Sequence, residues 1–267
     1  MNYNILKKFD RSNYFSHPFP HFIIHDALDY KEYLELEKEY EKIDLYFSSK
    51  KEYKKNNIRL QFNQNDLKNL NVDLPNWSKF MDFHSSEVFF KKLFEIFLND
   101  LKIKYPSLVD EILINPKQFT HYCQPGINTP VKSKTTVRIP HLDKYDTLFT
   151  GLFYLKPEED KTSGGDLVIH ESIKKNYFYS KLEVSNLNSV IVNKKIKYDK
   201  NVFICFLNSE KAIHSVTERN VTNKTRRLVN FITKVPPQLS PIFTTTRDKN
   251  YLRILRNKLR DLIILAK

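Results

Sequence analysis

The chain has 267 residues, a formal net charge of +13 and a pI near 9.4. No stretch is long and apolar enough to span a bilayer, the first residues lack the apolar core of a secretory signal, and the two cysteines imply no disulfide framework. These features argue against a membrane-spanning or disulfide-stabilised protein and predict a soluble, cytoplasmic one. The positive charge is dispersed over many lysines without a recognised nucleic-acid motif, so we expect neither nucleic acid nor a membrane as partner.

The first part of the chain, residues 1–115, is predicted to be a helical N-terminal support region. Its opening, up to Ile24, is expected to be extended because closely spaced prolines exclude a helix. Apolar residues then recur at helical intervals over Tyr30 to Lys42 and again over Ser86 to Lys104. Pro106 ends the second pattern, which places the last predicted helix directly before the next region.

Residues 116–235 change to short β-rich runs separated by polar turns, a pattern typical of a jelly roll. We therefore predict a single domain over 1–267, mainly β with flanking helices, whose core is a double-stranded β-helix (jelly roll, cupin-like). In residues 236–267, the stretch from Thr246 to Lys267 has leucines on one face and basic residues mostly elsewhere. This pattern predicts a C-terminal amphipathic helix that docks on its own sheet or forms a homodimer.

The predicted jelly roll contains a candidate metal site. His141 and Asp143 are two residues apart, so in a strand both side chains project from the same face. His214 follows the apolar run 202–207, which predicts a buried strand. Two imidazoles and one carboxylate occupy one face of an octahedral ion and leave other positions open, which suits non-haem Fe(II). Zinc is more often held tetrahedrally. We therefore predict His141, Asp143 and His214 as metal ligands and catalytic residues.

Two adjacent arginines precede the predicted strand 228–232. A guanidinium at this place can bind a carboxylate through two parallel hydrogen bonds. Strand alternation sends Arg226 and Arg227 to opposite faces, so only one of them can face the metal ligands. The residues alone leave the choice open.

The order of these motifs resembles that of the 2-oxoglutarate/Fe(II)-dependent dioxygenases, in particular the prolyl 4-hydroxylase-like branch of bacterial and phage type. The resemblance covers roughly residues 15 to 235, and its specific motifs are confined to about 118 to 232. They are an opening at 18–24, the His-x-Asp pair at 141–143, the run 147–155, Gly-Gly-Asp-Leu at 164–167, the distal His214, and the closing strand that begins with Arg226 and Arg227.

The resemblance implies an Fe(II) enzyme that uses 2-oxoglutarate and O2 to hydroxylate an unactivated C–H bond, with release of succinate and CO2. Ascorbate is a further reductant that it admits. It favours Arg226 over Arg227 as the anchor of the cosubstrate, although the chain between His214 and Arg226 is longer than usual. It also suggests that the Tyr122 hydroxyl hydrogen-bonds the cosubstrate, a structural role being the alternative, and that Asn230 faces inward on the side of Arg226.

The substrate class is less constrained by these residues. A prolyl or other peptide residue is the first expectation, and a small metabolite is the second. The segment 123–140 is predicted to be an insertion at the substrate rim, where Lys132, Lys134 and Arg138 favour an acidic ligand. Two other classes compete: a non-catalytic jelly-roll module that binds an acidic glycan or nucleic acid, and a cupin-type enzyme with another metal and no 2-oxoglutarate.

Overall fold

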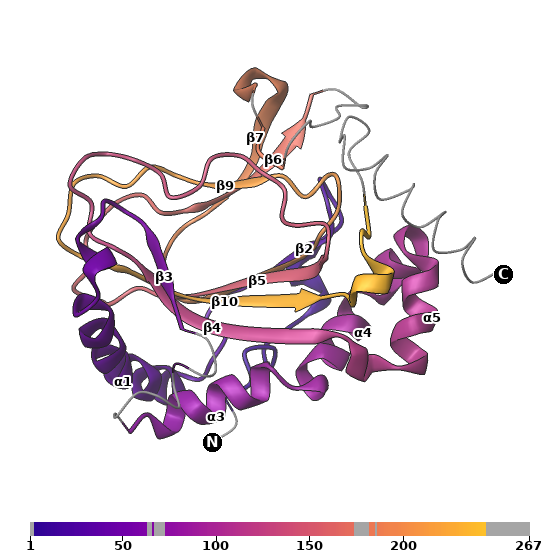
Figure 1. Cartoon of the computed structure of the whole chain (residues 1–267), viewed down its shortest axis with the longest axis horizontal. Coiled ribbons are helices and arrows are strands. Elements are labelled where there is room, and N and C mark those ends of the chain that lie inside the picture. Colours follow the sequence, from indigo (N-terminus) through magenta and orange to yellow (C-terminus); the bar gives the residue numbers. More distant parts are fainter. Residues whose placement is uncertain (1–2, 63–65, 67–72, 174–181, 185, 244–267) are drawn as a thin grey trace, which may run out of the picture.

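The computed structural model describes residues 3–62, 66, 73–173, 182–184 and 186–243. Within them, a larger and a smaller antiparallel β-sheet lie one above the other, and helices cover the outer side of the larger sheet (Figure 1). The larger sheet has the strand order β1-β2-β8-β5-β10-β4-β3 and the smaller one β7-β6-β9. The strands are Tyr14–Phe15 (β1), His21–Ile24 (β2), Arg59–Gln61 (β3), Thr120–Asn128 (β4), Thr147–Leu155 (β5), Leu167–Ser172 (β6), Val190–Ile196 (β7), Lys200–Leu207 (β8), His214–Val216 (β9) and Arg226–Lys234 (β10).

The path of the chain between the two sheets identifies the fold. From β5 in the larger sheet it passes to β6 and β7 in the smaller one, then to β8, back to β9, and finally to β10 between β5 and β4. This repeated crossing between two antiparallel sheets is the topology of a jelly roll. The predicted double-stranded β-helix core is therefore confirmed.

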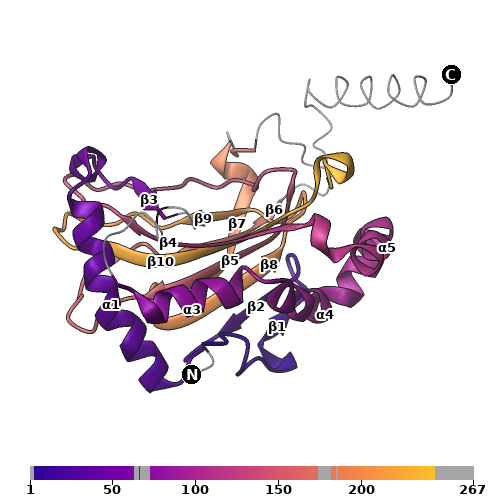
Figure 2. The same ribbon diagram turned by 60° about the horizontal axis from the view of Figure 1, so that its bottom comes forward.

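Helices pack against the face of the larger sheet that points away from the smaller one (Figure 2). The helical segments are Arg11–Asn13 (η1), Tyr30–Ser48 (α1), Lys51–Lys54 (η2), Pro75–His84 (α3), Glu87–Lys104 (α4), Pro106–Ile114 (α5), Pro116–Gln118 (η3), Leu187–Ser189 (η4) and Pro237–Leu239 (η5). The helix predicted to end at Lys42 continues to Ser48, while α4 has the predicted length and is capped by Ser86, whose hydroxyl accepts from the amide of Phe89. Among the described helices, none is both long and apolar enough to cross a bilayer.

The strands of the larger sheet separate two apolar layers. On β5, Phe149 and Phe153 point toward the helices, whereas Leu152 and Tyr154 point toward the smaller sheet. The same alternation on β10 places Val229 and Phe231 under the helices. We call the helix-covered side the outer face and the other side the inner face. Because side chains alternate, every second residue of β4, β5 and β10 lies on the inner face.

The structure differs from the sequence-based expectations in two places, and it leaves a third expectation untested. The N-terminal region is not purely helical, because β1 and β2 extend one edge of the larger sheet and β3 extends the other. The segment 123–140 is not a separate insertion: its first part completes β4, and isolated bridges from Val131 and Thr135 align its remainder with the chain after β9. The predicted C-terminal helix, Thr246 to Lys267, lies outside the described residues.

Candidate metal and anion-binding site

The structure brings His141, Asp143 and His214 together at the inner face. One ligand atom of each residue lies within 4.8 Å of the other two. The Nε2 atoms of the two histidines are both 3.8 Å from Oδ1 of Asp143. The backbones of His141 and His214 exchange two hydrogen bonds of 3.0 Å, and this pairing sets the two rings side by side. The segment 141–143 is therefore not the regular strand that the spacing predicts, although His141 forms an isolated bridge.

Hydrogen bonds orient all three side chains. Nδ1 of His141 lies 2.8 Å from the carbonyl oxygen of Ile139, and Nδ1 of His214 lies 3.0 Å from that of Ala212. Each Nδ1 thus donates to a backbone carbonyl, which leaves the lone pair of Nε2 free for a metal ion. The Thr150 hydroxyl donates to Oδ2 of Asp143 at 2.6 Å, so Oδ1 remains the ligand oxygen.

The pKa shifts of His141 and Asp143 suit a divalent ion. Burial, together with the neighbouring His214, lowers the pKa of His141 to about 3. Burial raises the pKa of Asp143, but His214, His141, the Thr150 hydroxyl and Arg59 outweigh it and hold this pKa below its ordinary value. A neutral imidazole and an ionised carboxylate are the forms that bind metal. This donor set fits Fe(II) held by two histidines and one carboxylate.

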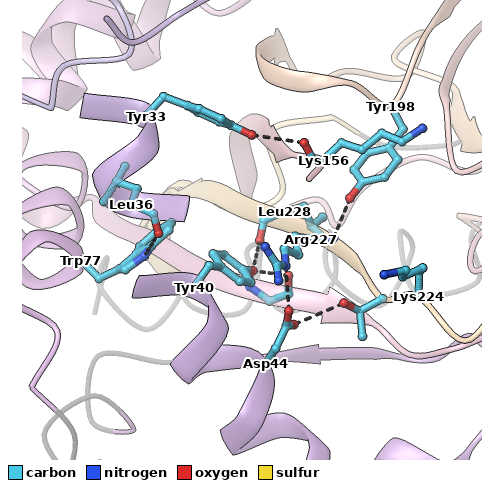
Figure 3. Close-up of polar contacts among 12 residues, drawn as sticks. Tyr33, Leu36, Tyr40, Asp44, Trp77, Lys156, Tyr198, Lys224, Arg227 and Leu228 are labelled. Atoms are coloured by element: carbon cyan, nitrogen blue, oxygen red, sulfur yellow. Dashed lines mark hydrogen bonds and ion pairs between the residues drawn. The ribbon is translucent and has the colours of Figure 1, made fainter. Parts of the chain in front are cut away.

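The two adjacent arginines lie on opposite faces of β10. Arg227 is on the outer face, where its Nε donates to Oδ2 of Asp44 on α1 at 2.7 Å and its guanidinium lies over the Tyr40 ring (Figure 3). Arg226 is on the inner face and is completely buried. It contacts the rings of Tyr154 and Tyr198. Only Arg226 therefore faces the side of the sheet that carries the metal ligands.

The contacts of Arg226 leave one donor group free. Its Nε donates to the carbonyl of Gly165 at 2.7 Å and its Nη1 to Oδ1 of Asn128 at 2.9 Å. Nη2 is buried and has no hydrogen-bond partner among the described residues. Gly165 has a φ of +81°, and a Cβ there would lie 2.7 Å from Cδ of Arg226. Gly165, the second glycine of the Gly-Gly-Asp-Leu motif, thus provides the space through which Arg226 passes.

A row of polar residues crosses the inner face beside Arg226. Asn128 on β4 is paired with Arg226 on one side and with Arg59 of β3 on the other. Two residues along β3, Gln61 lies over Gly126, where a Cβ would be 2.9 Å from its Cγ. Nδ2 of Asn128 and Nε2 of Gln61 are also buried without a partner among the described residues. The unpartnered nitrogens are donors, which is the complement of a carboxylate.

Sequence reasoning missed Arg59 and Gln61. A signal was present, because Ile58, Leu60 and Phe62 alternate with these two polar residues at the period of a strand. The run is only three residues long as a strand, and its pairing with β4 depends on contacts distant in the sequence. The predicted basic rim, by contrast, is largely paired: Lys134 lies 3.3 Å from Glu218 and Arg138 3.5 Å from Glu183.

The remaining two candidates lie on the inner face at a distance from Arg226. Asn230 is buried and paired with Leu152. Tyr122 pairs with Ile232, six residues along β10 from Arg226, and is 39 % exposed. The tyrosines that contact Arg226 are Tyr154 and Tyr198, so a role for Tyr122 in holding a cosubstrate stays a prediction.

Comparison with known proteins gives no sequence match: no family model and no curated protein matches the chain. Among solved structures, a prolyl 4-hydroxylase from Phytophthora capsici is 12% identical, with a TM-score of 0.46 over 82% of this chain. This chain covers 61% of that protein's length. A Pseudomonas putida prolyl 4-hydroxylase is 11% identical, with a TM-score of 0.45 over 80% of this chain and 92% of the other. A Trichoplax adhaerens prolyl hydroxylase is 15% identical, with a TM-score of 0.40 over 88% and 87%. All three are named as prolyl hydroxylases.

Proposed function

We propose that this protein is a 2-oxoglutarate- and Fe(II)-dependent oxygenase that hydroxylates an unactivated C–H bond, with release of succinate and CO2. The observation that supports the proposal most strongly is the combination, on one face of the sheet, of a three-ligand centre and a buried arginine with an unused donor. The first fits iron and the second fits the far carboxylate of a dicarboxylate cosubstrate.

Each residue has a defined task in this proposal. His141, His214 and Asp143 hold the iron, and Thr150 keeps the carboxylate bound through one oxygen. The iron supplies the activation of O2 when it is bound. Nη2 of Arg226 and Nδ2 of Asn128 bind the far carboxylate of 2-oxoglutarate, and the rings of Tyr154 and Tyr198 exclude water from the guanidinium. Burial of both histidines likewise limits access of water to the centre.

The two competing classes account less well for the buried donors. In a non-catalytic binding module, nothing requires two histidines and one aspartate whose possible ligand atoms all lie within 4.8 Å of one another. A cupin-type enzyme without 2-oxoglutarate offers no anion to the buried Nη2 of Arg226, and buried donors are normally hydrogen-bonded. We propose a peptide residue, prolyl first, or a small metabolite as the substrate.

An anaerobic titration with Fe(II) and 2-oxoglutarate tests the proposal. The visible charge-transfer band of the chelate is expected only when both are added, and Asp143→Ala is expected to abolish it. Asp110→Ala, which removes an exposed carboxylate from α5, is the matched control and should keep the band. A folded wild-type protein that gives no band would contradict the proposal and favour the binding module.

A further inference from the structure

Arg59 is a second arginine on the inner face, and it comes from outside the jelly-roll core. It lies on the short edge strand β3, in register with Asn128, which is itself in register with Arg226. Residues directly opposite each other on adjacent strands share a face of the sheet. The side chain of Asn128 contacts that of Arg226, so this face is the inner one. Arg59 therefore projects toward the same side as the anchor and the metal ligands.

Charged groups of both signs act on the Arg59 guanidinium. Burial and the charge of Arg226 lower its pKa to about 10, Arg138 acts in the same direction, and Asp143 acts in the opposite one. No described carboxylate oxygen lies within 4.0 Å of its guanidinium, and no hydrogen bond to another described residue satisfies it. Asp143 is the carboxylate whose charge acts on Arg59, but it already accepts a hydrogen bond from Thr150 and is a predicted metal ligand.

A count of charges shows that Arg59 is in excess at the proposed centre. Iron(II) and Arg226 bring three positive charges. Asp143 and the two carboxylates of 2-oxoglutarate bring three negative ones, and a histidine that binds a metal does so as a neutral ligand. The loaded centre is therefore balanced before Arg59 is counted. A further cation in a partly buried, water-poor site is unfavourable unless an anion joins it.

The cosubstrate does not require Arg59 for its far carboxylate. Arg226 and Asn128 already present buried, unpartnered N–H groups there, and Gln61 presents a third two residues along β3 from Arg59. At least two of the about four acceptor positions of a carboxylate are thus occupied without Arg59. Arg59 is a partly exposed residue on the edge strand β3, so it can meet a molecule that enters between the sheets from solvent.

We propose that Arg59 selects the substrate: it binds an anionic group, a carboxylate or a phosphate, carried by the substrate near the carbon that is hydroxylated. This inference rests on the proposed function and narrows its substrate class. Because Arg59 and Arg226 both lie opposite Asn128, an anion bound to Arg59 would lie on the inner face, the side toward which the metal ligands point. Substrates of this kind include an acidic amino acid, an acidic peptide residue and a small organic acid.

Small anions test the site without knowledge of the substrate. The probe is acetate, with acetamide as its uncharged counterpart, titrated into the anaerobic protein saturated with Fe(II) and 2-oxoglutarate. The thermal midpoint and the chelate band are recorded, and inorganic phosphate forms a second arm that distinguishes the two anion types. We expect a saturable effect of acetate or phosphate at millimolar concentration, and none of acetamide.

Three variants assign the effect to Arg59. Arg59→Gln should weaken binding of the small anion at least tenfold, and Arg59→Lys should weaken it less because the charge remains. Lys102→Gln removes an equal charge from the exposed side of α4 and should behave as wild type. All three should need the same concentration of 2-oxoglutarate, within about threefold, to form the chelate band.

Two results would overturn the inference. One is the absence of any saturable effect of acetate or phosphate on the loaded wild-type protein. An effect of equal size on wild type and Arg59→Gln would count in the same way. The other is a 2-oxoglutarate requirement raised as much by Arg59→Gln as by Arg226→Gln, since Arg59 would then belong to the cosubstrate anchor. If the chelate band forms in both wild type and Arg59→Gln, either of these results rejects only the role of Arg59 and leaves the proposed function standing. If the wild type gives no band, the proposed function itself fails.

Discussion

Arg226 and Arg227 are neighbours on one strand, and their surroundings are opposites. On the outer face, Arg227 pairs with Asp44 of α1 (Figure 3). The hydroxyl of Tyr40, also on α1, donates to the carbonyl of Gly126. On the inner face, Arg226 makes two hydrogen bonds to neutral oxygens and leaves Nη2 unpartnered. Buried polar groups are normally satisfied, so a closed network indicates a structural role and an open one indicates a place for a ligand.

The largest expected effect is on cosubstrate binding and comes from replacing Arg226 on the inner face. Arg226→Gln removes the charge that would hold the far carboxylate of 2-oxoglutarate. Loss of a buried, charge-assisted pair costs about 3 to 4 kcal/mol, so the concentration of 2-oxoglutarate needed for the chelate band should rise by about a hundredfold or more. Binding of Fe(II) alone, measured by metal analysis, should stay close to that of the wild type. Loss of iron instead would mean that Arg226 supports the fold of the centre.

The corresponding change on the outer face should act on stability. Arg227→Gln leaves Asp44 without its cation in a largely buried place, which should lower the free energy of unfolding by about 2 to 3 kcal/mol. The measurement is chemical denaturation of both variants beside the wild type. The requirement for 2-oxoglutarate should not change. If Arg227→Gln raises it and Arg226→Gln does not, the two faces have been assigned the wrong way round.

The amino-acid sequence predicts the fold of the core better than it predicts which side of a strand is used. The runs that become β5, β8 and β10 are apolar and bounded by turns, so their existence follows from local pattern. The choice between Arg226 and Arg227 does not, because a shift of one residue exchanges the faces. It is decided by Asp44, which lies far away in the sequence.

The metal ligands show a different relation between sequence and structure. Their spacing predicts that His141 and Asp143 share one face of a strand, and the structure brings them together without that strand. What aligns them is the backbone pairing of His141 with His214, a contact between distant parts of the chain. Arg59 was missed for the same kind of reason, since its place on the inner face follows from the pairing of β3 with β4. Local pattern names the residue types, and long-range pairing selects which of them meet.

A smaller effect is expected where the inner face supports the metal ligands indirectly. Thr150→Val keeps the shape of the side chain and removes the hydroxyl that donates to Asp143. Groups that orient a metal ligand contribute about tenfold or more to affinity, so Fe(II) binding should weaken by about tenfold. Stability without metal should change little. An unchanged iron affinity would show that the Thr150 hydrogen bond is not needed to orient the Asp143 carboxylate.

The smallest expected effect separates the two faces by pH. His84 is the last residue of α3 on the outer face, in contact with the rings of Phe80 and Phe89, and burial lowers its pKa to about 3. In the unfolded chain it titrates near 6.5, so the stability that comes from keeping it neutral is present above pH 6.5 and is lost as the pH falls toward 3. At pH 5.5 this amounts to about 1 kcal/mol relative to pH 7.

His84→Gln retains a polar side chain and does not titrate. The variant should therefore lose about 1 kcal/mol less than the wild type when urea denaturation is repeated at pH 7 and pH 5.5. Its requirement for 2-oxoglutarate should be that of the wild type at both values, because His84 is separated from the inner face by the larger sheet. A pH-dependent change in cosubstrate binding in this variant would mean that the sheet transmits the state of one face to the other. Protonation on the outer face would then affect binding on the inner face, and the two faces would not be independent.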